Sequence, residues 1–358
     1  MVKGEIRVSL KIIHCADLHL DSVFSYLKEE QSRCRREDLK SAFIKTIDAV
    51  KVNNADMLII SGDLFDETHV SRHTFKFVCD RISEISSVPV YICAGNHDPK
   101  TPSSYYLGES FPENVHVFDT KMETIETENY DIYGISFPEK NVNTSYLENF
   151  KVKNPDKINI MVMHGDFTSN DYNLITKTQI EQSGLDYLAL GHIHKFEVIN
   201  VKDALAVYPG CPEGRGFDET GEKGIVLASI SKEKKDVKFI PTSRRILHEI
   251  QIDISETQDN LSLCEKLKKQ INENDLYKIV LSGEPDFEPS KDVLIDNLDA
   301  FFVKVYDETM PKGSLLKSAD EFSLKGLFIK KALSEIEKNG DETDKMALKI
   351  GLNALLGR

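Results

Sequence analysis

The residues of this chain best suited to chemistry are carboxylates, imidazoles and one amide that each follow a short apolar run. Seven of them are candidate metal ligands: Asp17, His19, Asp63, Asn96, His164, His192 and His194. Oxygen and nitrogen donors without a thiolate suit Mn, Fe, Zn or similar divalent ions better than a structural zinc. A single Gly-Asp pair is usually only a turn, and a lone histidine at a strand end is usually structural. Here such residues follow several apolar runs in succession, and this repetition favours a metal site.

Asp63 is the residue around which we expect this site to form. It follows the apolar run 57–60, which is typical of a buried strand that ends in a glycine turn. Open α/β sheets place their chemistry at the carboxyl ends of strands, and a carboxylate there can bridge two metal ions. Asp17 and His19 are two residues apart, so in extended backbone both side chains would point to one side and close on one ion. The alternating His192 and His194 are expected to share a face in the same way.

Asn96 and His97 are neighbours with different predicted roles. Asn96 offers an amide oxygen to a metal ion, whereas His97, one residue on, should point towards substrate. Two ions about 3.5–4 Å apart, bridged by Asp63, would hold a hydroxide that attacks phosphorus in line, and would neutralise charge on the phosphoryl oxygens. A protonated His97 would then donate to the leaving oxygen as general acid. The residues therefore point to phosphoester hydrolysis.

The elements that must position these residues alternate between strands and helices up to residue 240, which predicts parallel strands in a layered α/β sheet. Strands are predicted at 10–14, 57–60, 88–93, 158–163, 187–190, 206–208, 224–230 and 237–240, with short β-like segments between 115 and 135. Helices are predicted at 37–53 and 71–85. Each candidate ligand then lies just after a strand.

A small α+β unit and two terminal helices are expected after the first domain. Strands at 246–254, 277–281 and 301–306 surround a helix at 261–271, and further helices are predicted at 324–339 and from 341. We therefore predict three regions, at 1–243, 244–320 and 321–358. In the terminal hairpin Leu324 and Leu327 belong to an apolar stripe, whereas Ile329, Leu348 and Leu352 lie beyond the stripes. The two helices either bury their stripes against each other or form a groove for a partner's coiled coil.

Composition limits the functional classes. The formal net charge of −14 argues against non-specific wrapping of nucleic acid, although a local basic groove stays compatible with it. Arg33, Arg35 and Arg36 are candidates for DNA phosphate contacts, while a solvated face is the commoner role of such a stretch. Scattered cysteines, the lack of a signal peptide and the lack of an apolar run near ~18 residues indicate a cytoplasmic chain outside the membrane.

The motifs Asp-x-His, Gly-Asp-x-x-Asp, Gly-Asn-His-Asp, His-Gly and Gly-His-x-His together resemble the calcineurin-like metallophosphoesterase superfamily over residues 10–240. Within it the chain is most similar to the SbcD/YhaO group of DNA repair exonuclease subunits, through residues 14–21, 191–195 and 208–224. The resemblance implies an α/β fold with a four-layer metallophosphoesterase β-sandwich flanked by helices, plus a small α+β capping domain and C-terminal helices. It also implies Mn²⁺ as the usual activating ion.

The same resemblance implies a role for each candidate residue. It assigns one metal ion to Asp17, His19, Asp63 and His194, and the other to Asp63, Asn96, His164 and His192. It makes His97 the proton donor. In phosphatases of the superfamily the second Asp of Gly-Asp-x-x-Asp orients that histidine, and Asp66 stands at this position, where some nuclease relatives have a histidine.

Three functions are open at this stage. The first is a two-metal DNA exonuclease or endonuclease subunit of a DNA repair complex, with DNA and an SMC-like ATPase of the SbcC/YhaN type as partners and a homodimer as a further option. The second is a metallophosphatase or phosphodiesterase that acts on a small molecule or a phosphoprotein. The third is a non-catalytic scaffold for the ATPase, against which the complete ligand set counts. A capping unit that lines a long basic groove would favour the first function, and a closed pocket the second.

Overall fold

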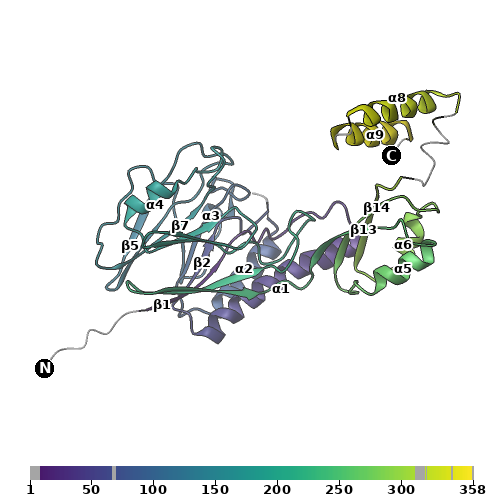
Figure 1. Ribbon diagram of the computed structural model, residues 1–358. Helices are drawn as coiled ribbons and strands as arrows, with labels where there is room; N and C mark the ends of the chain where they lie inside the picture. The colour runs from purple at the N-terminus through teal and green to yellow at the C-terminus, as the bar shows by residue number, and fades with distance from the viewer. Residues whose placement is uncertain (1–8, 67–69, 311–318, 320, 340–341, 357–358) are drawn as a thin grey trace. The chain divides into compact units, whose positions relative to one another are not determined.

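The computed structural model describes residues 9–66, 70–310, 319, 321–339 and 342–356 (Figure 1). The chain divides into two compact units, 1–247 and 248–358. The predicted boundaries of three regions, at 243/244 and 320/321, stay predictions. Among the described residues no helix combines the length and the apolar character that crossing a membrane requires.

Two six-stranded sheets form the first unit. The first sheet, in the order β12-β11-β1-β2-β3-β4, consists of β1 (Leu10–Cys15), β2 (Met57–Ser61), β3 (Val90–Cys93), β4 (Val115–Val117), β11 (Gly224–Ile230) and β12 (Lys235–Pro241). The second, in the order β5-β6-β7-β8-β10-β9, consists of β5 (Glu123–Glu126), β6 (Tyr130–Gly134), β7 (Ile158–His164), β8 (Tyr187–Gly191), β9 (Glu197–Val201) and β10 (Ala204–Tyr208). Strands β1 to β4 pair in parallel, as do β6, β7, β8 and β10, so the prediction of parallel strands is confirmed.

Alternation of side chains along the strands produces the layers. In β1, Ile12 packs into the core between the two sheets, whereas Ile13 packs on the opposite face against helices. Helices α1 (Glu29–Asn53) and α2 (Arg72–Ser83) cover the first sheet, and α4 (Lys177–Ser183) covers the second. Helix α3 (Tyr105–Gly108) is a single short turn. Helices, sheet, sheet and helix make four layers, which confirms the predicted fold class (Figure 1).

Helix α1 differs most from its predicted bounds. It begins at Glu29 rather than at residue 37, so it contains the whole basic stretch. Phe43 and Ile47 recur at helical spacing and are buried against the first sheet. The helix ends where Asn54 adopts a left-handed conformation, φ 48°, and its N–H bonds back to the last turn.

The second unit contains a three-stranded sheet of β13 (Leu247–Asp253), β14 (Leu276–Ser282) and β15 (Phe302–Asp307). Strands β14 and β15 are parallel, with Ile279 opposite Val305. Helices α5 (Asn260–Lys268) and α6 (Lys291–Asn297) pack against one face of this sheet around Leu263, Leu267 and Leu294. The strands match the predicted α+β unit, whereas α6 was not predicted.

The terminal helices α8 (Leu324–Asn339) and α9 (Glu342–Leu356) pack against each other (Figure 1). Ile329 and Leu348 are buried between them, whereas Leu324 and Leu327 are exposed. Leu324 and Leu327 were predicted to lie in the apolar stripe of the hairpin, and Ile329 and Leu348 beyond the stripes. This prediction is wrong for these four residues, because the two helices pack against each other at Ile329 and Leu348. The side chain of Leu352 lies outside the described residues.

Candidate metal centre

The loops that follow β1, β2, β3, β7 and β8 meet at one end of the two sheets. Main-chain hydrogen bonds tie the first two loops together, from Asp17 N–H to the Gly62 carbonyl at 3.1 Å and from His19 N–H to the Asp63 carbonyl at 2.9 Å. Asp17, His19 and Asp63 have left-handed backbone conformations, with φ of 54°, 44° and 50°. The prediction that Asp17 and His19 converge through extended backbone is therefore wrong, since left-handed turns at both residues bring them together.

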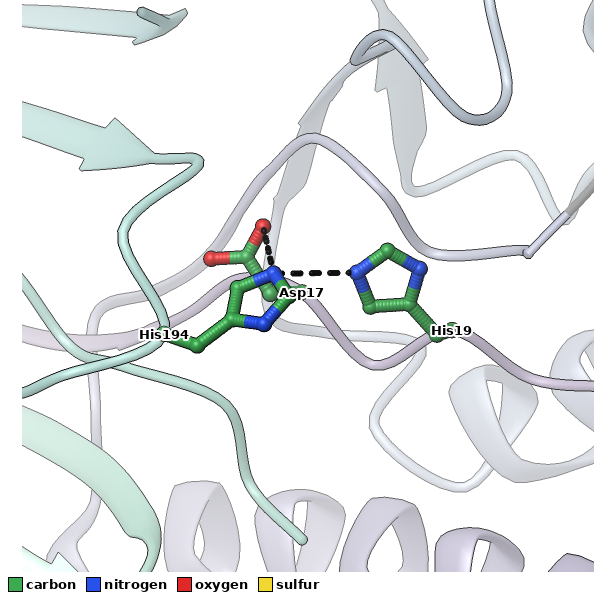
Figure 2. Close-up of side chains that lie close together, drawn as sticks. All are labelled: Asp17, His19 and His194. Carbon is green, nitrogen blue, oxygen red and sulfur yellow. Dashed lines mark hydrogen bonds and ion pairs between the residues drawn. The ribbon is translucent and has the colours of Figure 1, made fainter. Parts of the chain in front are cut away.

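Asp17, His19 and His194 form the first group of donor atoms, and Figure 2 shows their side chains turned towards one another. His19 Nε2 lies 3.3 Å from His194 Nε2, and Asp17 Oδ1 lies 3.7 Å from the same nitrogen. These donors come from two distant segments, after β1 in the first sheet and after β8 in the second. The site therefore exists only when the two sheets are packed.

Asp63 stands between this group and a second one. Its Oδ2 lies 3.6 Å from His19 Nε2 and also 3.6 Å from His164 Nε2. Its Oδ1 accepts a hydrogen bond from His97 N–H at 2.9 Å. At Gly62, φ +91°, a Cβ would lie 2.3 Å from His164 Nδ1, so only glycine lets the imidazole approach this closely. One carboxylate oxygen thus reaches both halves of the site.

The second group consists of Asn96, His164 and His192. Asn96 Oδ1 lies 2.9 Å from His164 Nε2 and 3.2 Å from His192 Nδ1. The main-chain N–H of His192 donates to both oxygens of Asp17, at 3.1 Å each. All seven predicted ligand residues are thus brought together around Asp63. His192 and His194 belong to different groups, as the assignment of the two ions implies, and their shared face stays a prediction.

Hydrogen bonds on the far side of each ring decide which nitrogen faces the centre. His19 Nδ1 bonds to the Asp66 carboxylate at 2.9 Å, His194 Nδ1 to Glu219 at 2.6 Å, and His164 Nδ1 to the Ser61 carbonyl at 3.0 Å. Carboxylates and carbonyls only accept, so each Nδ1 carries a hydrogen. The pKa values of His19 and His164 are lowered, so these two neutral rings present a bare Nε2. Metal-binding histidines are usually held in this way.

The consequence is a set of acceptors that face one another. Nε2 of His19 lies 3.3 Å from Nε2 of His194 and 3.6 Å from Asp63 Oδ2. Against the effect of burial, Asp17 and Glu219 raise the pKa of His194. Likewise Nε2 of His164 faces the amide oxygen of Asn96. Lone pairs that face one another repel unless a proton or a metal ion lies between them. Nitrogen and oxygen donors in this arrangement fit divalent ions in two adjacent positions.

Burial and neighbouring charges shift the protonation of these groups in opposite directions. Burial lowers the pKa of His19 to about 4 and also lowers that of His164, which keeps both rings neutral. Burial, reinforced by Asp63, raises the pKa of Asp17 to about 6. Burial opposes ionisation of Asp63 too, but the surrounding histidines hold its pKa below the usual value. Binding of a cation would displace the remaining protons, so we expect metal binding to release protons.

His97 lies beside the first donor group, with its ring centroid 4.7 Å from that of His19, and it shares a further cluster of possible ligand atoms with His19 and Asp66. Its Nδ1 lies 3.3 Å from Asp66 Oδ1 and 3.2 Å from the Asp66 carbonyl oxygen, and its side chain is 40 % exposed. The hydrogen bond to Asp66, helped by Asp63 and opposed by burial, raises the pKa of His97 to about 8. The arrangement leaves Nε2 of a protonated imidazole available to a bound molecule at the edge of the site.

Sequence reasoning missed three residues of this region: Asp98, Arg215 and Glu219. Asp98 accepts hydrogen bonds from the main-chain N–H groups of Asp63, Gly95 and Phe65, so it ties the loops after β2 and β3 together. Glu219 holds His194, and Arg215 Nη1 lies 2.9 Å from Asp66 Oδ1. Arg215 lies in the glycine-rich segment 209–216, whose composition does not indicate which site it contacts.

The predicted DNA contacts need one correction. Arg35 is fully buried and its guanidinium binds Asp38 at 2.7 Å and Glu213 at 2.8 Å, so it cannot contact DNA at the surface. Helical geometry explains this, because Arg35 is on the inner face of α1. Arg33 is exposed and Arg36 is half-buried beside Glu29, and their contact with DNA stays a prediction.

A helix-flanked pair of α/β sheets with clustered histidines, carboxylates and an amide at the strand ends defines a metallophosphoesterase. The chain belongs to the calcineurin-like phosphoesterase family, whose model matches residues 10–196. The predicted resemblance to that family is confirmed. Members of this family use divalent metal ions to hydrolyse phosphoesters, and the donor groups described above form a candidate site for them.

Curated relatives extend the similarity beyond the family model. The uncharacterized metallophosphoesterase YhaO of Bacillus subtilis is 27% identical over 293 residues, which cover 77% of this chain and 70% of YhaO. The SbcD subunit of the SbcCD nuclease of Staphylococcus saprophyticus is 24% identical over 304 residues, which cover 75% of this chain and 77% of SbcD. Within its family the chain therefore resembles the SbcD/YhaO group.

Proposed function

We propose that the chain is the nuclease subunit of a DNA repair complex and that it hydrolyses DNA phosphodiester bonds with two Mn²⁺ ions. The observation that carries phosphoester hydrolysis is the position of Asp63 Oδ2, 3.6 Å from a bare nitrogen in each of the two donor groups. DNA as the substrate is supported by the similarity to a nuclease subunit over three quarters of the chain.

In this proposal Asp17, His19, Asp63 and His194 hold one ion, and Asp63, Asn96, His164 and His192 hold the other. When bound, two divalent ions supply an activated water and neutralise charge on the phosphoryl oxygens. His97 holds the proton that passes to the leaving oxygen, and its partly exposed ring is within reach of a bound phosphodiester. Asp66 holds His97 through Nδ1, which leaves Nε2 as the donating atom.

A phosphatase or phosphodiesterase that acts on a small molecule is the second candidate. Asp66 favours it, since the phosphatases that the chain resembles have an aspartate at this position and some nuclease relatives have a histidine. The contact between Asp66 and His97 would serve either reaction, because both need a protonated donor to the leaving oxygen. Substrate choice must therefore be measured.

We further propose that an SMC-like ATPase binds the terminal hairpin of α8 and α9. Apolar side chains on its surface support this: Phe322, Leu324, Leu327, Met346 and Ile350 are exposed. A pocket of about 590 Å³ lined by Phe322, Leu324 and Leu327 lies at the start of α8. Exposed apolar surface of this kind fits an amphipathic helix of a partner.

The proposal is tested by incubating the purified protein with single- and double-stranded DNA and, separately, with p-nitrophenyl phosphate. We expect DNA cleavage with Mn²⁺, none with EDTA, and none by the Asp63→Asn variant. Asp80→Asn, which changes an exposed aspartate paired with Lys76, is the matched control and should cleave like the wild type. Hydrolysis of p-nitrophenyl phosphate without DNA cleavage would favour the second candidate. No hydrolysis of any phosphoester would contradict both.

A further inference from the structure

Arg215 connects two carboxylates that stand behind the candidate metal centre. Its Nη1 lies 2.9 Å from Asp66 Oδ1 and 3.3 Å from the hydroxyl of Ser22. Its Nη2 lies 3.5 Å from Glu219 Oε1, and its own main-chain N–H donates to Glu219 Oε2 at 2.6 Å. The side chain of Arg215 is 19 % exposed, so solvent screens these contacts only in part. One side chain thus holds both Asp66 and Glu219.

The two carboxylates in turn hold three imidazoles. Asp66 binds Nδ1 of His19 and lies beside Nδ1 of His97, while Glu219 binds Nδ1 of His194. Each of these contacts fixes the plane of a ring and the nitrogen that it presents to the centre. Against the effect of burial, hydrogen bonds from His19 and His97 hold the pKa of Asp66 far below its usual value, and the charge of Arg215 adds a smaller contribution.

We propose that Arg215 is a positioning residue that fixes His97, His19 and His194 through Asp66 and Glu219. This inference rests on the proposed hydrolysis for its effect on rate, but its effect on the three rings is independent of any reaction. Arg215 itself is not assigned a contact with substrate. Its role is to fix the orientation of the proton donor, His97, relative to the two metal ligands, His19 and His194.

The backbone around Arg215 is anchored as a positioning residue requires. Tyr26 donates its hydroxyl hydrogen to the Arg215 carbonyl at 2.7 Å. On the other side, buried Arg35 binds Glu213 and the carbonyl of Gly214, the two residues before Arg215. Helix α1 therefore fixes the glycine-rich loop, and the loop presents Arg215 to the site. Arg35 is buried and cannot contact DNA, and its role is to anchor this loop.

Lysine would not replace Arg215. The planar guanidinium presents its donors as a rigid fork, so Nη1 and Nη2 bind different carboxylates at the same time. A lysine ammonium is a compact point charge on a flexible stem and cannot span both. We therefore expect Arg215→Lys to keep the charge of the region but lose the simultaneous hold on Asp66 and Glu219.

The first test reads the imidazoles directly and needs no activity. In metal-free protein labelled with ¹⁵N-histidine, we expect Arg215→Gln and Arg215→Lys to shift the ring signals of His19, His97 and His194. His116, which binds Glu123 at 3.2 Å elsewhere in the unit, is the internal control and should not move. Arg72→Gln, a change of an exposed arginine on α2, should leave all four rings unchanged. Unmoved rings in both Arg215 variants would overturn the inference.

The second test uses two phosphodiesters, one with a nitrophenolate leaving group and one with an alkoxide leaving group, at saturating Mn²⁺. We expect each Arg215 variant to lose roughly 10–100-fold with the alkoxide and much less with the nitrophenolate, because only the alkoxide needs full protonation. Equal losses on both substrates would overturn a role through His97. If the wild type hydrolyses neither substrate, the proposed function fails, and the ring signals still decide the role of Arg215.

Discussion

Asp66 holds His97 with two atoms: its carboxylate Oδ1 lies 3.3 Å and its main-chain carbonyl oxygen 3.2 Å from the same Nδ1. Both atoms are acceptors, so Nδ1 carries a hydrogen. The negative charge of the carboxylate favours the protonated ring. This contact raises the pKa of His97 to about 8 and places the labile proton on the side away from Asp66. It is the basis of the first two predictions.

The reaction should be sensitive to alkaline pH. A general acid works in its protonated form, so the rate should be full below the pKa of His97 and fall as pH rises through about 8. Asp66→Asn removes the charge that raises this pKa, so the alkaline limb should move to lower pH. The measurement is kcat against pH for both proteins at saturating Mn²⁺. An identical alkaline limb in the variant would contradict the contact's role.

Removal of His97 should separate catalysis from metal binding. His97→Ala should lose roughly 10²–10⁴ in rate and keep near-normal metal content, since His97 is not one of the seven residues proposed to hold the two ions. A leaving group of low pKa should restore part of the rate because it needs less protonation. Metal analysis and kinetics on the same preparation check both parts. Activity within about threefold of the wild type would rule out His97 as general acid.

The arginines in the basic stretch of α1 should have different roles, according to whether their side chains are buried. Arg33→Ala with Arg36→Ala should weaken DNA binding without regard to sequence and flatten its dependence on salt, if these two arginines contact phosphates. Arg35→Ala should instead lower the free energy of unfolding by about 3–5 kcal/mol, because Glu213 would keep a buried charge without its arginine partner, although Asp38 would still pair with Arg245 at 2.8 Å. Binding titrations at several salt concentrations and chemical denaturation separate the two effects. If the salt dependence of DNA binding is unchanged in the double variant, Arg33 and Arg36 only form a solvated face and do not contact phosphates.

Deletion from Ser323 onward should remove the ATPase site and spare the metal centre. All the donor residues lie in the first compact unit, whereas α8 and α9 belong to the second. We expect the truncated protein to keep its metal content and its nuclease activity but to lose capture of an SMC-like ATPase in a pull-down. Continued capture would move the partner site elsewhere. Loss of a cooperative melt would show that the hairpin serves the fold.

Much of the first unit could be predicted from the sequence because its strands are short, apolar and punctuated by glycine. The patterns before Asp63, Asn96 and His164 each mark a buried strand, and the parallel pairing brings their ends together. Strand β9 and helix α4 were missed. Three of the five residues of β9 are exposed and only two of the seven residues of α4 are buried, so neither carries a clear apolar period.

Residues whose role depends on a distant partner could not be predicted. In the sequence Arg35 is part of a basic run, and its partner Glu213 lies 178 positions further along the chain. Arg215 and Glu219 likewise gain their roles only when the loop after β10 reaches the end of β1. The geometry of Asp17 was misjudged for a local reason, since a left-handed aspartate is uncommon and nothing in the sequence distinguishes it from extended backbone.

The proposed two-metal site depends on one carboxylate, that of Asp63, which both ions would share. Metal analysis of the protein equilibrated with Mn²⁺ and then desalted tests it most directly, with wild type, Asp63→Asn and the surface control Asp80→Asn side by side. We predict two ions per chain in the wild type and the control, and loss of both in Asp63→Asn, because its Oδ2 faces both donor groups. Two ions retained by Asp63→Asn would contradict the claim.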